Sequence, residues 1–189
     1  DDTPVEHMKA ATEAMDTELG RLFDGMGAEL QENTTIFFFG DNGTPSQTTE
    51  LPFLRNHSKG TPYEGGVRVP FVVAGPAVAS GGREATSVVS VVDMLATVGD
   101  LTGHDLRPPL VKTDSVSIVP YLSNSLQTSL RSTIYAESFT AGSNPLNNGF
   151  AVARNVDYKL IRNYRASGSV TEELYHLPSD PFETNDLTA

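Results

Sequence analysis

Thr34-Thr35-Ile36-Phe37-Phe38-Phe39-Gly40-Asp41-Asn42-Gly43 is the stretch that decides the fold. Its apolar run is short and continuous, which is typical of a strand covered on both faces in a parallel sheet. Asp41 and Asn42 follow where this strand meets a turn, and open α/β sheets bind ligands outside the carboxyl ends of their strands. Two alternatives stay open locally. Asn-Gly favours a tight turn, whereas carboxylate and amide oxygens are suitable ligands for Ca²⁺ or Mg²⁺.

A lysine-bearing motif, Lys59-Gly-Thr-Pro-Tyr-Glu-Gly-Gly-Val-Arg-Val-Pro70, follows after a polar loop. Its glycines allow the backbone to approach other groups closely. Lysine acts as a point charge on an oxyanion, and His57, two residues before Lys59, can donate to the same anion. A solvated lysine and an idle, exposed histidine are the alternatives. Together with Asp41 and Asn42, the motif suggests a site for an anionic substrate.

The composition narrows the class of protein. The 189 residues include 13 basic and 24 acidic side chains, which gives a net charge of -11, and no cysteine. This charge argues against non-specific nucleic-acid binding, which needs a basic surface. No apolar run approaches the roughly 18 residues that a membrane span requires. An anionic substrate would therefore need local positive charge or a metal ion.

Hydrophobic periodicity indicates an α/β chain with a small antiparallel sheet at its end. Helices are expected over residues 4–30, where Thr3 and Glu6 form a capping box, and over 88–101, with a short helical turn within 116–122. Val67 to Ala74 is predicted to form a second buried strand near a sheet edge. The four later strands are expected at Thr133–Glu137, Phe150–Arg154, Tyr158–Asn163 and Glu173–His176. A boundary near residue 131 would divide the chain into 1–131 and 132–189.

The order of strand, Asp-Asn-Gly, loop and Lys-Gly-Thr-x-Tyr-Glu-Gly-Gly-Val-Arg-x-Pro resembles the C-terminal portion of type I sulfatases, such as the arylsulfatases. That family belongs to the alkaline-phosphatase-like superfamily. The lysine motif is long and specific. Further segments that resemble family landmarks are Val91–Thr97, Asp114–Leu122, Asp157–Ile161 and Glu173–Tyr175.

The resemblance implies a fold and a set of roles. Residues 1–131 would form the C-terminal part of an alkaline-phosphatase-like α/β sandwich with a mostly parallel sheet. Residues 132–189 would form a small lobe with a four-stranded antiparallel sheet. Asp41 and Asn42 match two Ca²⁺ ligands of the family, with Mg²⁺ possible, and Lys59 matches the lysine that contacts the sulfate. The implied location is periplasmic or secreted.

Other family features have no counterpart in these residues. The family's nucleophile is a formylglycine made in a Cys/Ser-x-Pro-x-Arg motif, and two further metal-ligand aspartates come from an earlier strand. Neither is found here. We therefore expect a portion of a longer sulfatase, inactive alone, whose partners are the missing N-terminal half and a sulfate ester. A phosphatase or phosphonate hydrolase of the same superfamily and a non-catalytic cation-binding pseudoenzyme fragment are the alternatives.

Overall fold

The computed structural model describes residues 2–106, 112–139 and 148–189. The chain divides into two compact units, Asp1–Pro76 and Ala77–Ala189. The predicted boundary between two domains, near residue 131, falls inside the second unit. The division into 1–131 and 132–189 stays a prediction. No helix in the described part is both long and apolar enough to cross a bilayer.

The first unit begins with a long helix, α1 (Pro4–Gly25), followed by a short one, α2 (Ala28–Glu32). The predicted capping box is confirmed, because the Thr3 amide donates to the Glu6 carboxylate at 3.0 Å and the Glu6 amide donates to Thr3 Oγ1 at 3.3 Å. The prediction of a single helix over residues 4–30 was wrong. The chain leaves the helical conformation at Met26, whose φ and ψ are extended, between two glycines that weaken a helix.

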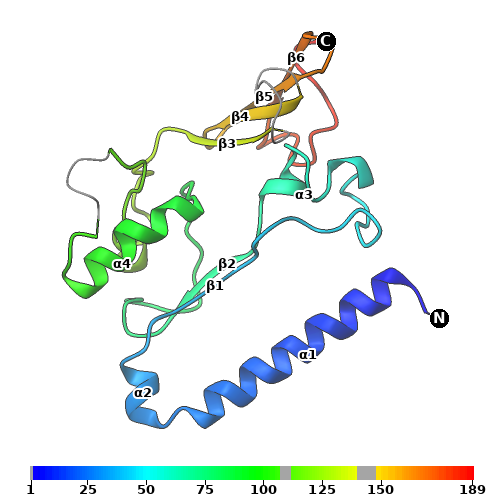
Figure 1. The fold of residues 1–189 in the computed structure, drawn as a ribbon. Coiled ribbons are helices and arrows are strands. Elements are labelled where there is room, and N and C mark those ends of the chain that lie inside the picture. The colour runs from blue at the N-terminus through cyan, green and yellow to red at the C-terminus, as the bar shows by residue number, and fades with distance from the viewer. Residues whose placement is uncertain (1, 107–111, 140–147) are drawn as a thin grey trace. The chain divides into compact units, whose positions relative to one another are not determined.

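The apolar side chains of α1 are not buried in this unit. None of its residues is buried, and Leu22 is 59% exposed. Burial of this helix against a sheet is therefore not seen in the described part of the chain. The Thr3–Glu6 capping box marks its first turn, and Figure 1 shows it as the long blue helix.

Two strands form the sheet of the first unit, β1 (Ile36–Phe39) and β2 (Phe71–Ala74). They pair antiparallel, with Phe37 opposite Val73 and Phe39 opposite Phe71. The parallel neighbours that the apolar run suggested are not among the described residues. β2 begins four residues later than expected, because Val67 ends a one-turn helix, α3 (Glu64–Val67), and Pro70 has no amide to donate to a strand ladder.

The second unit is organised around a buried aspartate. A 3₁₀ turn, η2 (Val91–Asp93), leads into α4 (Met94–Thr102), which ends at Gly103 in the left-handed region with φ +71°. The Asp93 carboxylate accepts hydrogen bonds from the amides of Ser90 and Val116, each at 2.9 Å, and from Arg131 Nε at 2.9 Å. This one side chain therefore ties together α4, the segment before α5 (Val119–Ser123) and the entry to the second sheet.

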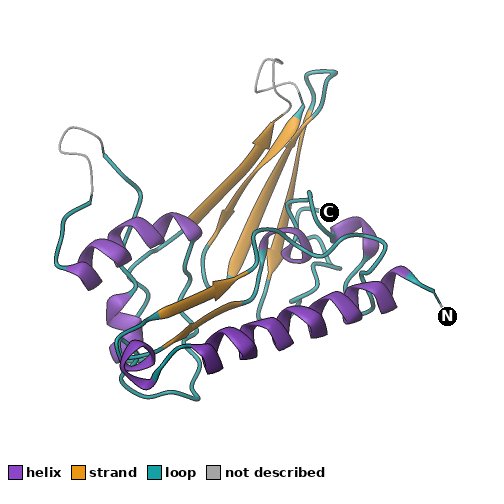
Figure 2. Cartoon of the chain, turned by 60° about the horizontal axis from the view of Figure 1, so that its bottom comes forward, coloured by secondary structure: helices purple, strands orange, loops and turns teal. Residues whose placement is uncertain are grey.

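The second sheet has the order β3-β4-β5-β6 and is antiparallel throughout. Its strands confirm the predicted set, with slightly different ends: β3 (Ile134–Phe139), β4 (Gly149–Arg154), β5 (Tyr158–Tyr164) and β6 (Val170–His176). Figure 2 shows them as neighbouring arrows. Val152, Ile161 and Tyr175 are buried on this sheet. Val152 and Ile161 are direct cross-strand partners, so their side chains share one face of the sheet.

Candidate functional site

The Asp-Asn-Gly turn packs directly on the glycine pair of the lysine motif. A Cβ atom on Gly43 would lie 2.1 Å from the Gly65 carbonyl oxygen and 2.7 Å from Gly66 Cα. These distances leave no room for any side chain. Asp41 and Asn42, just before Gly43, are exposed. The two motifs predicted from the sequence to share a site are thus in backbone contact within the first unit.

Lys59 is tethered to the same turn through its backbone. Its amide donates to the Thr44 carbonyl at 2.8 Å, and its side chain is exposed. The residue before it, Ser58, is buried, and its carbonyl accepts hydrogen bonds from the amide and the hydroxyl of Thr61 at 3.1 and 2.6 Å. The lysine therefore projects from a short turn whose backbone is held on both sides.

Gly65 and Gly66 pack closely on the backbone of the loop that carries Lys59. A Cβ atom on Gly65 would meet the His57 carbonyl oxygen at 2.3 Å, and one on Gly66 would meet the Thr61 carbonyl oxygen at 2.3 Å. The expectation that these glycines serve close backbone approach is confirmed. They seat the first turn of α3 against the lysine loop on one side and against Gly43 on the other.

His57 lies inside the loop. It ends the 3₁₀ turn η1 (Arg55–His57) and is only 7% exposed. Its ring stacks on the ring of Tyr63, with a centroid separation of 3.5 Å and an interplanar angle of 8°. The predicted donation from His57 to a substrate anion stays a prediction. The stack itself was not expected from the sequence, because the two residues are separated by the lysine segment.

Asp41 and Asn42 offer the right ligand atoms for a hard cation, but two residues provide too few ligands. Their carboxylate and amide oxygens are the ligand types that Ca²⁺ and Mg²⁺ prefer, and Ca²⁺ takes about six to eight oxygens. The described ranges contain no cluster of three or more histidine, aspartate or glutamate side chains that could hold a metal. These two residues can therefore supply only part of a metal site, and the other ligands must come from elsewhere.

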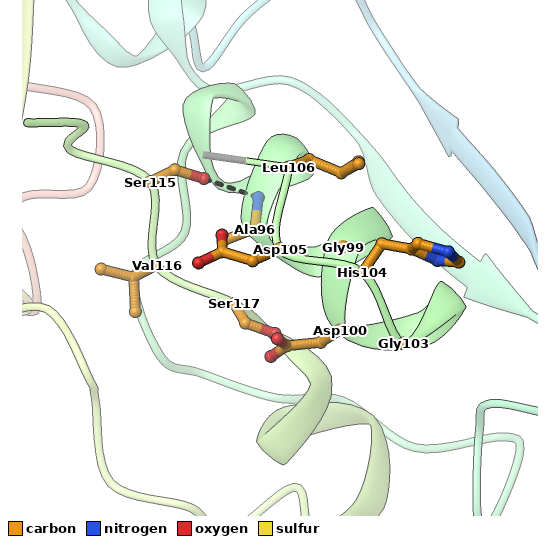
Figure 3. Close-up of a pocket in the computed structure, with 10 residues that line it drawn as sticks. All are labelled: Ala96, Gly99, Asp100, Gly103, His104, Asp105, Leu106, Ser115, Val116 and Ser117. Carbon is orange, nitrogen blue, oxygen red and sulfur yellow. Dashed lines mark hydrogen bonds between the residues drawn. The ribbon is translucent and has the colours of Figure 1, made fainter. Parts of the chain in front are cut away.

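A separate cavity of about 510 Å³ lies beside the C-terminal end of α4 in the second unit. Figure 3 shows the carboxylates of Asp100 and Asp105 among its lining groups. The hydroxyl of Ser115, which is uncharged, accepts a hydrogen bond from the Ala96 amide at 2.8 Å. The described lining residues include no lysine or arginine. An acidic cavity does not suit an anion, and it contains none of the predicted site residues.

Replacing Gly43 by alanine should destabilise the first unit by about 1–3 kcal/mol, because backbone atoms would have to move to admit the Cβ atom. Thermal unfolding of the full-length protein measures this change. The matched control is Gly20→Ala in α1, where nothing lies within 4 Å of the new Cβ and the helix should gain up to about 1 kcal/mol. An unchanged melting temperature for Gly43→Ala would contradict the close contact.

Comparisons with known proteins bear on the family of this chain. A model of the family described as Sulfatase matches residues 5–104, and one described as N-sulphoglucosamine sulphohydrolase, C-terminal, matches residues 55–189. Arylsulfatase G of Rattus norvegicus is 33% identical over 147 residues, covering 71% of this chain and 28% of that protein. Choline-sulfatase of Rhizobium meliloti is 30% identical over 174 residues, covering 92% of this chain and 31% of that protein.

A solved structure adds evidence on the fold. It was determined in complex with its substrate D-glucosamine-2-N,6-O-disulfate, and it matches with a TM-score of 0.75 at 23% identity over 94% of this chain and 35% of the other. The predicted α/β class with a C-terminal antiparallel sheet lobe is thereby confirmed. The chain spans about a third of the length of the relatives it matches. Since one family model matches more than half of its residues, this chain belongs to the sulfatase family.

Proposed function

We propose that this chain forms part of a sulfuric ester hydrolase, in which it supplies Lys59 to the sulfate group and Asp41 and Asn42 to a divalent metal ion. The observation that carries the proposal is the direct packing of the Asp-Asn-Gly turn on the lysine motif, with the Lys59 amide bonded to Thr44 at 2.8 Å. The chain's membership of the sulfatase family supports the choice of substrate class.

Lys59 would act on the charge of the sulfate. Cleavage of a sulfate ester increases negative charge on the leaving and nonbridging oxygens, and a fixed cation close to these oxygens stabilises that charge. The chain carries a net charge of -11, so a local cation is needed to attract an anion at all. The exposed ammonium group on a fixed turn meets that need.

Asp41 and Asn42 would hold the metal, for which we propose Ca²⁺, with Mg²⁺ as the alternative. When bound, such an ion supplies Lewis-acid polarisation of a sulfate oxygen. The remaining ligands and the formylglycine nucleophile would come from the upstream part of a longer protein. This chain alone, which carries neither, would be inactive. Direct donation from His57 to the sulfate stays a prediction, and its buried, stacked ring favours another role.

The full-length protein tests the proposal with two chromogenic substrates, an aryl sulfate and the matching aryl phosphate. A sulfatase hydrolyses the sulfate with the higher kcat/KM. Preference for the phosphate would favour the phosphatase alternative, and hydrolysis of neither ester by protein that still binds Ca²⁺ would favour the non-catalytic one. Reading the upstream residues for Cys/Ser-x-Pro-x-Arg provides an independent check.

Replacing Asp41 by alanine should abolish Ca²⁺ binding or weaken it at least about tenfold, because a carboxylate is the charged ligand of the pair. Isothermal titration calorimetry of the full-length protein with Ca²⁺ measures the stoichiometry and the affinity. Asp16→Ala, which removes an exposed carboxylate from α1, is the matched control and should leave both unchanged. Equal stoichiometry and affinity in Asp41→Ala and wild type would count against the assignment.

A further inference from the structure

The His57–Tyr63 stack closes the base of the loop that carries Lys59. The two aromatic residues flank the five-residue segment 58–62, and their rings are nearly parallel at 8° with centroids 3.5 Å apart. Rings this close and parallel lie face to face, and contact over a whole ring face restricts their relative orientation. The stack therefore joins the two points at which this segment enters and leaves the body of the unit.

Backbone contacts fix the same base from other directions. The Thr61 amide donates to the Ser58 carbonyl at 3.1 Å inside the segment, and the Gly66 amide donates to the Tyr63 carbonyl at 2.8 Å just after it. The His57 carbonyl lies against Gly65 at a distance that excludes a Cβ atom. With its base held, the segment can present Lys59 at one position, although the lysine side chain itself is exposed and long.

His57 is poorly placed for direct contact with a substrate. It is 7% exposed, and one face of its ring is covered by Tyr63. Lys59, two residues later, is exposed and carries the charge that an anion requires. The flat imidazole ring fits against the Tyr63 ring, and this stacking explains the buried position of His57 better than a hydrogen bond to the substrate would.

We infer that His57 is a positioning residue, which acts through its stack on Tyr63 to hold the 58–62 loop so that Lys59 meets the sulfate. This inference rests on the proposed function for the identity of the anion, but the loop-holding role stands on the stack alone. Positioning errors of about 1 Å can cost on the order of a hundredfold in rate, so a residue that fixes the loop can matter without touching the substrate.

Two substitutions at His57 separate positioning from contact. His57→Phe keeps a flat ring and removes both ring nitrogens, whereas His57→Ala removes the ring. In the full-length protein we expect His57→Phe to keep kcat/KM for an aryl sulfate within about threefold of wild type, and His57→Ala to lose about tenfold or more, mainly in kcat. Equal losses in both variants would overturn the inference and favour direct contact.

A structural readout makes the result independent of activity. Hydrogen exchange of a peptide covering residues 58–62 should speed up about tenfold or more in His57→Ala, including at the Lys59 amide, and stay within about threefold of wild type in His57→Phe. Unchanged exchange in His57→Ala overturns the inference. If the wild-type protein cleaves no sulfate ester, the proposed function fails, and this comparison still decides whether His57 holds the loop.

The double variant completes the test. If His57 acts through Tyr63, then His57→Ala/Tyr63→Leu should exchange no faster than the more affected single variant, because both remove the same stack. Additive effects of the two substitutions would contradict action through the stack.

Discussion

Replacing Lys59 by alanine should lower kcat for a sulfate ester about a hundredfold or more while leaving the fold intact. Loss of one preorganised charge or donor at a developing oxyanion typically costs about 10²–10³ in rate. The fold should survive because the contact that anchors this residue is made by its backbone amide, at 2.8 Å from the Thr44 carbonyl, and its side chain is exposed. Steady-state kinetics of the full-length protein with an aryl sulfate measure the effect.

The matched control removes an equal charge elsewhere. Lys9→Ala takes an exposed lysine from α1 in the same unit and should leave kcat unchanged, which excludes a general effect of net charge. Circular dichroism and Ca²⁺ titration of Lys59→Ala should match wild type. Wild-type turnover in Lys59→Ala would refute the role of this lysine, and a lost fold would refute the claim that its side chain is not structural.

Short local rules in the sequence single out the candidate site residues, whose chemical roles stay predictions. Asp41 and Asn42 follow an apolar strand, and Lys59 lies in a long motif with three nearby glycines. The structure adds the reason for Gly43, which is backbone contact with Gly65 and Gly66 of the lysine motif. Sequence spacing alone could not show this contact, because it depends on how a polar loop folds back on itself.

Other features escaped prediction for identifiable physical reasons. The apolar run of β1 was expected to mark parallel neighbours, but within the described ranges β1 pairs antiparallel with β2. An apolar strand reports burial, not the direction of its partner. The break after α1 was missed because the apolar periodicity continues to Leu30, while Gly25 and Gly27 favour an end. The apolar periodicity predicted a continuous helix there, whereas the low helix propensity of the two glycines predicted an end, and the helix ends at Gly25.

The C-terminal segment contains a buried ion pair that strand patterns could not reveal. Lys159 in β5 and Glu183 in the segment after β6 are 0% and 1% exposed, and Lys159 Nζ lies 2.7 Å from Glu183 Oε1. Glu183 has φ +56°, a left-handed conformation that is unfavourable for a residue with a Cβ. The segment docks on β6 further along, where the Leu187 amide donates to the Leu174 carbonyl at 2.8 Å. The pair therefore anchors the end of the chain to the sheet.

Replacing Lys159 by methionine should lower the local stability of β5 and β6 by about 3–5 kcal/mol, because it leaves the Glu183 carboxylate buried without its charged partner. Hydrogen exchange of peptides covering Tyr158–Tyr164 and Val170–His176 in the full-length protein measures the free energy of opening. The loss should be much smaller in the double variant Lys159→Met/Glu183→Met, since replacing both members of a buried pair by apolar side chains is often nearly neutral.

An exposed pair on the same two strands provides the control for this prediction. Arg162 and Glu172 face each other across β5 and β6, with side chains 49% and 44% exposed. Arg162→Met should change the exchange of these peptides little, because exposed ion pairs contribute little to stability. Equal effects of Arg162→Met and Lys159→Met would show that burial does not set the strength of the Lys159–Glu183 pair. An effect confined to Lys159→Met would show that burial of a carboxylate without its charged partner, and not loss of a positive charge, lowers the stability of β5 and β6.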